Sequence, residues 1–513
     1  MKNLDQVWLI ARRELIDQMR DWRILAPMII LTLFFPYLMT VAAQATIKYV
    51  NQYGANLIAE RMLPFLILVV GYFPVTVSLV VALESFVGEK ERGTIEPLLT
   101  SPIADEHLYL GKLLTGTLVP LTVSYLGIAL YLGGLWWQGI KWPAWGFIAQ
   151  TLALTAVQTL LMVSAAIVVS TQSTTVRAAN LLASFIVIPI ALLIQGESAL
   201  MFWGTNDVLW LAVIGVIIMS GLVIRLGLAH FRRENLLGRE IDMLNLGWVW
   251  RTFLVSLTGS DQPTSLTRYL RSVFKPEPGE EPQSPSLAAA LWADFQAIGR
   301  WYRQDVRQAL ARLAPAFWIT FLIGTLAAGL AFIYVRVNLP AHALSQATLD
   351  EALKAIRSML LDQTPDGLSS ALLFWHNLRA ELVMVGLGVF SFGVLSLLAL
   401  IANFVLIGAV LGLVQLVNLS PLTVFMAGIL PHGLFELPSI ILACAVILHF
   451  GLRLVTPESG RSIGETLIVT LADVVKILVA VCLPLLLIAA LVEANLTPRI
   501  LLAVLGHVLE IRP

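Results

Sequence analysis

Apolar stretches of about 20 residues recur along this sequence, each long enough to cross the hydrocarbon core of a bilayer as a helix. In the first half they fall at 24–43, 63–83, 113–135, 144–170, 179–195 and 208–229. Hydrocarbon offers the backbone no hydrogen-bond partners, so a spanning segment must satisfy its own amides and carbonyls, as a helix does. The pattern predicts an all-α, polytopic integral membrane protein.

The composition supports this prediction. Only 13% of the 513 residues are charged and 58% are hydrophobic, whereas soluble domains carry about 25% charged residues. This balance argues against a soluble enzyme, a nucleic-acid-binding protein and a disordered chain. Both cysteines, Cys444 and Cys482, lie in apolar runs, which favours packing residues over a disulfide framework.

The distribution of basic residues predicts which side of the membrane each loop occupies. Basic residues cluster at alternate span boundaries, at Lys2, Arg12, Arg13, Arg20, Arg23, Lys90, Arg92, Lys112 and Arg177, while the opposite loops hold only Lys48, Arg61 and Lys141. The positive-inside rule then predicts a cytoplasmic N-terminus. Residues 4–22 alternate between apolar and charged positions at helical spacing, which predicts an amphipathic helix in the inner interface.

The second half is less regular. Residues 246–314 are rich in basic and aromatic residues and predict a cytoplasmic linker with amphipathic helices. Spans are expected at 316–335, 434–452 and 474–496, and a short helix near 350–361 in a polar extracytoplasmic segment. The uncharged stretch 382–431 fits two spans hinged near Asn403, or one span and a re-entrant segment. We expect about 11 spans in two bundles.

A charge-dense segment follows the second span. Residues 84–103 read ESFVGEKERGTIEPLLTSPI, and Gly111-Lys112 follow shortly after. Gly93 and Thr94 can end one helix and cap the next, and an acid in the first turn of the second helix, Glu96, would favour its dipole. A solvated loop and a docking site for a cytoplasmic partner both fit these residues.

This segment resembles the signature of ABC-2-type permeases, the membrane subunits of ABC exporters, and the resemblance covers residues 1–245. It implies a permease in a bacterial or archaeal plasma membrane, driven by a separate ABC ATP-binding subunit and paired with a second permease half, either a homodimer or a sister permease. No Gly-x-x-x-x-Gly-Lys-Ser/Thr run occurs, so we expect no cofactor on this chain and ATP on the partner subunit. The resemblance implies that the ATPase-coupling residues are Glu84, Glu89, Glu91, Arg92, Gly93, Thr94, Glu96, Leu98, Leu99, Pro102, Gly111 and Lys112.

A second distinctive string, LPHGLFELP, occupies residues 430–438. Pro431 suits a helix start, and His432 and Glu436 are four residues apart, on one helical face. Ionisable residues in a span are functional candidates by default. Three readings compete: a structural His–Glu bond, a partner-binding or gating site, and a metal or catalytic site, for which two ligands are fewer than zinc requires.

This string resembles the stage II sporulation protein M family, and the resemblance places that domain at 315–513. It implies a polytopic protein that recruits partners, including extracytoplasmic cell-envelope proteins, and has no catalytic role. The residues that carry the resemblance are Asn377, Asn403, Gly408, Pro431, His432, Gly433, Glu436 and Pro438.

The leading hypothesis is an ABC exporter permease whose fused membrane domain regulates it, assembles it or extends its path. The alternative is a non-transporting envelope scaffold that links an ATPase to cell-wall remodelling. An intramembrane enzyme built on His432 and Glu436 comes third. Membrane lipid is an expected partner and nucleic acid is not. No span carries a central charged cluster that would indicate a substrate, and Gln158, Asn180 and Gln195 fit interhelical hydrogen bonds.

Overall fold

The computed structural model describes residues 2–53, 56–95, 100–173, 175–203, 208–231, 246–260, 287–338, 369–416, 419–456 and 461–505. Within these ranges all regular structure is helical, and nine helices are long and apolar enough to cross a membrane. The prediction of an all-α polytopic membrane protein is therefore confirmed. Contacts divide the chain into two units, residues 1–244 with 455–457 and residues 245–454 with 458–513.

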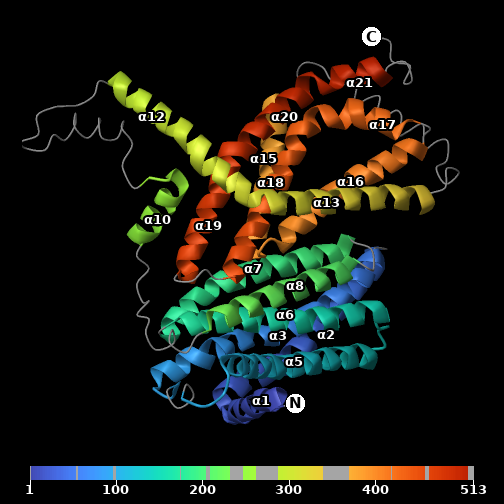
Figure 1. Cartoon of the computed structure of the whole chain (residues 1–513). Helices are drawn as coiled ribbons and strands as arrows, with labels where there is room; N and C mark the ends of the chain where they lie inside the picture. The colour runs from blue at the N-terminus through green and yellow to red at the C-terminus, as the bar shows by residue number, and fades with distance from the viewer. Residues whose placement is uncertain are drawn as a thin grey trace, which may run out of the picture. The chain divides into compact units, whose positions relative to one another are not determined.

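The first unit is a bundle of long helices (Figure 1). Its elements are α1 Lys2–Arg20, α2 Trp22–Tyr53, α3 Asn56–Glu91, α5 Asp105–Trp137, α6 Trp145–Gln172, α7 Val176–Trp203 and α8 Val208–His230. Helix α3 packs against α2, α5, α6 and α7, and α6 also packs against α8. The core is apolar, with Phe86, Leu108, Tyr109 and Met162 fully buried.

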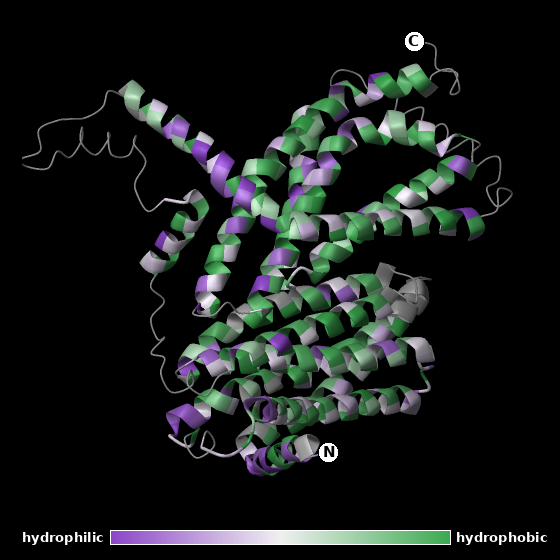
Figure 2. Cartoon of the chain, viewed as in Figure 1, coloured by the Kyte–Doolittle hydropathy of each residue, from purple (hydrophilic) through white to green (hydrophobic). Residues whose placement is uncertain are grey.

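Hydropathy separates the helix bodies of this unit from its ends (Figure 2). Hydrophobic residues run along the helices, while hydrophilic residues gather on α1 and at the end of α3. Helix α1 is amphipathic as expected: among its described side chains Ile10 and Ala11 are buried, whereas Trp8 and Met19 are exposed. Ile10 and Ala11 lie against α5, and the exposed Trp8 and Met19 remain available for the predicted membrane interface.

The second unit is built from helices of unequal length. Its elements are α10 Leu246–Thr258, α12 Leu287–Trp301, η1 Tyr302–Val306, α13 Arg307–Asn338, α15 Ser370–Phe390, α16 Val394–Leu416, α17 Pro421–Val424, η3 Phe425–Ile429, α18 Leu430–Val455, α19 Ile463–Ile477, η4 Leu478–Cys482, α20 Leu483–Asn495 and α21 Thr497–Leu505. The three π-helical turns, η1, η3 and η4, lie inside longer continuous helices. Helix α13 packs along α16, and α15 packs along α20.

The uncharged stretch 382–431 does not hinge near Asn403. It breaks at residues 391–393, where Phe392 has φ 53° and Gly393 has φ 94°, both left-handed values. Ser391 Oγ accepts from Leu395 N at 2.9 Å at the start of α16. Asn403 lies inside α16, where its Nδ2 donates to Ala399 O at 2.9 Å, so its side chain bonds the helix instead of breaking it.

Pro431 does not start a helix. The chain is already helical from Pro421, and the π-helical turn 425–429 ends two residues before the proline, which lies in the first turn of α18. A widened turn accommodates a residue that lacks an N–H and whose ring crowds the preceding turn. The stretch 382–431 thus contributes to three helices, the end of α15, all of α16 and the start of the helix ending at Val455. The expected helix near 350–361 lies outside the described residues.

Candidate functional site

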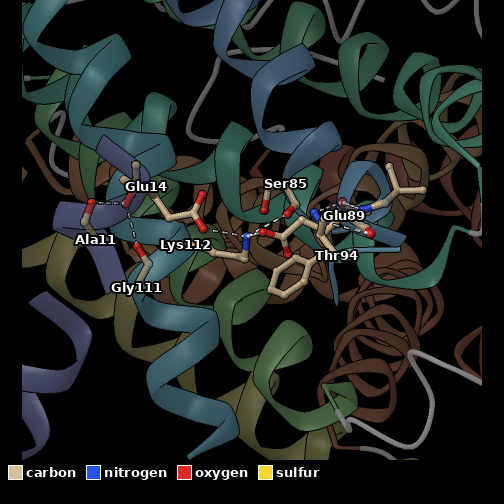
Figure 3. Close-up of polar contacts among 11 residues, drawn as sticks. Ala11, Glu14, Ser85, Glu89, Thr94, Gly111 and Lys112 are labelled. Atoms are coloured by element: carbon tan, nitrogen blue, oxygen red, sulfur yellow. Dashed lines mark hydrogen bonds and ion pairs between the residues drawn. The ribbon is translucent and has the colours of Figure 1, made fainter. Parts of the chain in front are cut away.

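Lys112 is a buried cation that joins three helices of the first unit. It lies on α5, is 3% exposed, and donates to Glu14 Oε1 on α1 at 3.1 Å. On α3 it donates to Ser85 O at 2.9 Å and Glu89 Oε1 at 3.0 Å (Figure 3). Its ammonium also lies 5.0 Å from the ring centroid of Phe86. An ammonium has three N–H donors, and here each has an acceptor.

The electrostatics of this cluster are set by burial. Desolvation raises the pKa of Glu89, and the charge and hydrogen bond of Lys112 oppose that rise only in part. Both carboxylates that pair with Lys112 are largely enclosed. Within a buried ion cluster, removal of one partner leaves the others with an uncompensated charge, which typically costs about 3–5 kcal/mol. The cluster therefore makes the positions of α1, α3 and α5 depend on one another.

Gly111 lets α1 approach α5 closely. A Cβ at this position would lie 2.7 Å from Ile10 Cγ2 and 3.3 Å from Val7 O. One turn along α5, Thr115 Oγ1 donates to Ala11 O at 3.2 Å. The close approach is what brings Lys112 within reach of α1, so Gly111 and Lys112 act together.

We expect Gly111→Ala to loosen the contact between α1 and α5. The added methyl must displace the Ile10 side chain, and overpacking of this kind costs about 1–3 kcal/mol. The thermal unfolding midpoint of the detergent-solubilised chain should fall. Gly133→Ala on the same helix is the control, because a Cβ there meets nothing within 4 Å. An equal midpoint for both variants would contradict this packing.

The end of α3 also holds the connection between α6 and α7. Lys90 Nζ donates to Thr171 O at 2.8 Å and Ser173 O at 3.0 Å, which satisfies carbonyls at the end of α6. Burial lowers the pKa of Lys90 to about 8. Glu91 Oε1 accepts from Val176 N at 2.8 Å, at the first residue of α7, where the helix dipole favours an anion.

Ser170 inserts into the backbone ladder of α3. Its Oγ accepts from Phe86 N and Val87 N, both at 3.1 Å, and donates to Leu83 O at 2.5 Å. A side chain in the i to i−4 ladder is a recognised cause of helix bending. Ser170 therefore couples α6 to the turn of α3 that leads into Glu89.

Helix α3 ends at Glu91, just before Gly93, as the sequence predicts. Thr94 N donates to Glu89 O at 3.0 Å and Gly93 N to Lys90 O at 3.1 Å, with Gly93 at φ 67°. These two bonds and the left-handed glycine form a Schellman motif. Glu91, Arg92, Gly93 and Thr94 are exposed around this end.

The remaining predicted coupling residues are placed less completely. Glu84 is exposed on α3, and Pro102 is exposed in a bend before α5. Glu96, Leu98 and Leu99 lie outside the described residues. Sequence reasoning did not single out Glu14, Lys90 or Ser170 as site residues. Lys90 stood within the charged run, but nothing in the spacing marked Glu14 or Ser170, because their partners lie far away in sequence.

The second unit has a polar cluster around the LPHGLFELP string. His432 does not bond Glu436 as the structural reading expects; its Nδ1 lies 3.2 Å from Thr497 Oγ1 instead. Glu436 lies within electrostatic range of Glu381 on α15 and Glu493 on α20. Glu381 Oε2 accepts from Ser439 Oγ at 2.8 Å. Among the described residues no group of three His, Cys, Asp or Glu side chains has a metal-binding arrangement.

The other motif residues of this unit serve mainly in packing. A Cβ at Gly408 would lie 2.0 Å from Ala328 O, so this glycine allows α16 to touch α13. At Gly433 the nearest side-chain atom would be 3.6 Å away, an ordinary contact. Pro438 lies inside α18, and Asn377 lies on α15 beside Glu493.

The helices and their polar ends define a multi-pass membrane protein, and comparison with known families divides it in two. The ABC-2 type transporter family matches residues 5–194, and the stage II sporulation protein M family matches residues 317–498. The chain therefore combines an ABC-2 type transporter domain with a stage II sporulation protein M domain. Both resemblances inferred from the sequence are confirmed, and these membrane families carry no catalytic domain.

Two curated relatives are similar to part of the chain, and both are described as probable ABC transporter permease protein NosY. The one from Pseudomonas aeruginosa is 31% identical over 121 residues, 24% of this chain and 42% of the relative. The one from Stutzerimonas stutzeri is 29% identical over 158 residues, 29% of this chain and 55% of the relative. The chain thus spans about half the length of the relatives it matches. These similarities point to an ABC transporter permease, a family that implies a partner ATPase.

Proposed function

We propose that this chain is the permease subunit of an ATP-driven ABC exporter, coupled to a separate ATP-binding subunit through residues 84–103. The observation that carries the proposal is the Lys112 cluster, in which one buried cation bonds α1 and α3 from α5. A force applied to the exposed end of α3 reaches all three helices through these bonds. ATP binds and is hydrolysed on the partner, and this chain binds no cofactor.

The exposed residues around Gly93 form the proposed contact surface for the ATP-binding subunit. Glu84, Glu91, Arg92 and Thr94 are exposed and include charges of both signs near the end of α3. Lys90 and Glu91 also hold the connection between α6 and α7, so movement of this end passes to those helices as well. The same end of the bundle carries α1, which we place at the cytoplasmic face, where a soluble ATPase is accessible.

A second permease half completes the transporter in this proposal, as a second copy or a sister permease. The stage II sporulation protein M domain regulates or assembles the complex. This role is supported by the cluster of Glu381, Glu436 and Glu493 from three helices, of which Glu381 is buried and the other two are half-buried. Ionisable residues in a membrane domain are functional-site candidates by default.

The contact surface can be tested by charge reversal at exposed positions that make no cluster bond. We expect Glu84→Lys combined with Arg92→Glu to weaken binding of the co-expressed ATP-binding subunit about tenfold, equivalent to about 1.4 kcal/mol. The double variant has the same net charge as the wild type, so a loss of binding would depend on where the charges lie. The measurement is the dissociation constant of the purified subunit for the chain in nanodiscs.

The control is Lys141→Glu, an exposed charge in the connection between α5 and α6, far along the helices from Arg92. It should bind as the wild type does. Unchanged binding by the double reversal would remove this surface from the interface. An ATP-binding subunit that never co-purifies with the wild-type chain would contradict the proposed function, and co-purification without substrate movement in sealed vesicles would favour the envelope scaffold that links an ATPase to cell-wall remodelling.

A further inference from the structure

Glu197 is a buried carboxyl group inside the bundle of the first unit. The apolar pattern ends its span at Gln195, but α7 continues to Trp203 and carries Glu197 within it. The residue is 3% exposed. Ile194 and Met201, three residues before and four after, belong to an apolar cluster with Leu154 and Val213, so Glu197 lies on an inward face of α7.

The hydrogen bonding of Glu197 is incomplete. Gln158 Nε2 on α6 donates to Glu197 Oε2, and this is the only hydrogen bond that the structure gives the carboxyl group within the described residues. Glu197 Oε1 and Gln158 Oε1 are both buried and have no hydrogen-bond partner there. Two acceptor oxygens at one buried pair therefore lack a donor, which is uncommon in proteins and requires an explanation.

Among the described side chains, none places a positive charge against the carboxyl group. Helix α7 packs against α3, α6 and α8. Tyr72 on α3 is its titratable neighbour. The charged residues of α3 are Glu60 and Arg61, about three turns before Tyr72, and those from Glu84 onward, about three turns after it. Helix α6 contains no titratable side chain. On α8 the titratable residues are Arg225, which is exposed, and His230, whose Nδ1 lies 3.0 Å from Leu226 O.

An ionised carboxylate in these surroundings would have one N–H donor and no counter-ion, which is expensive in an apolar interior. A proton on Oε1 removes the charge and turns an acceptor without a donor into an O–H group. A bound proton requires no cavity, whereas any larger ligand would require one. We propose that Glu197 is a proton-binding site of the permease, occupied while α6 and α7 are in contact and emptied when they separate.

The proposal adds a proton step to the transport cycle. The cycle rests on the proposed permease function, whereas proton binding by Glu197 does not depend on it. When α7 moves away from α6, water reaches the carboxyl group, the Oε1–H bond breaks, and the proton passes to water. A hydrated carboxylate remains. When the helices close again, the carboxylate takes a proton back from water. ATP-driven cycling is thereby linked to exchange of one proton at this site.

The proton is detected directly by infrared spectroscopy of the purified full-length chain at neutral pH. Wild type minus Glu197→Gln should show the carbonyl band of one protonated carboxylic acid, and this band should shift in D₂O. Glu106→Gln, at an exposed glutamate, should remove no such band. Gln158→Leu should keep the band but shift it, because the amide partner is gone. Absence of the Glu197 band would overturn the proposal.

The link to the cycle is measured in proteoliposomes containing the chain and its ATP-binding subunit, with an entrapped pH-sensitive dye. Addition of ATP should produce a transient proton release, followed by uptake, in the wild type that Glu197→Gln lacks while ATP hydrolysis continues. An identical signal in both would also overturn the proposal. If no ATP-binding subunit associates, the permease function fails, and the infrared result still decides whether Glu197 holds a proton.

Discussion

Lys112→Met should lower the stability of the first unit by about 3–5 kcal/mol and abolish stimulation of the partner ATPase. The substitution keeps the length of the side chain but leaves the largely enclosed carboxylates of Glu14 and Glu89 without a cation. It also leaves Ser85 O without its donor. The measurements are the chemical unfolding midpoint of the detergent-solubilised chain and the ATPase rate of the reconstituted complex.

A triple variant separates the two effects. Lys112→Met combined with Glu14→Gln and Glu89→Gln removes the whole charge cluster, and replacement of a complete buried ion cluster is often neutral or stabilising. We expect its stability to recover most of the loss while coupling stays impaired, because neutral side chains bind the three helices less firmly. Recovery of coupling together with stability would show that Lys112 serves folding alone.

Gly408→Ala should destabilise the second unit by about 3 kcal/mol, the upper end of the usual range for overpacking. The new Cβ would lie 2.0 Å from Ala328 O and 2.8 Å from Ala328 Cα. These are backbone atoms, so no rotamer change relieves the clash and α16 must move away from α13. The thermal unfolding midpoint of the detergent-solubilised chain measures the loss.

Gly386→Ala is the matched control for that substitution. Gly386 lies in α15 of the same unit, and a Cβ there meets nothing within 4 Å. We expect its midpoint to equal or slightly exceed that of the wild type, because alanine favours helix over glycine by about 1 kcal/mol. Similar losses in both variants would mean that α13 and α16 do not pack through Gly408.

The helical class and the membrane setting follow from the sequence because hydrocarbon permits so few backbone structures. The end of α3 was also predictable, since only glycine enters the left-handed region without strain, and Gly93 follows directly after a charged run. The break at residues 391–393 was not, because Phe392 is an unusual residue for a positive φ. Its place is set by contact with α18, where a Cβ at Gly451 would lie 2.1 Å from Phe392 O.

The candidate site was predictable as a set of residues but not as an arrangement. The charged segment and the Gly111-Lys112 pair that follows it predicted Glu89 and Lys112 as site residues. No local sequence pattern shows that a single buried ammonium binds helices whose residues are far apart in sequence. Glu197 was missed for a different reason. The polar residues Gln195 and Glu197 end the apolar pattern there, whereas tertiary packing extends the helix and buries the carboxyl group.

We propose that this chain and a separate ATPase drive one another. The most direct test of this proposal is the ATP hydrolysis rate of the co-purified ATP-binding subunit, measured in proteoliposomes with and without the chain. We expect the wild-type chain to raise the rate several-fold, and the stable triple variant of the Lys112 cluster to bind the subunit without raising it. An ATPase rate that is the same with the chain, without it and with the triple variant would contradict the account.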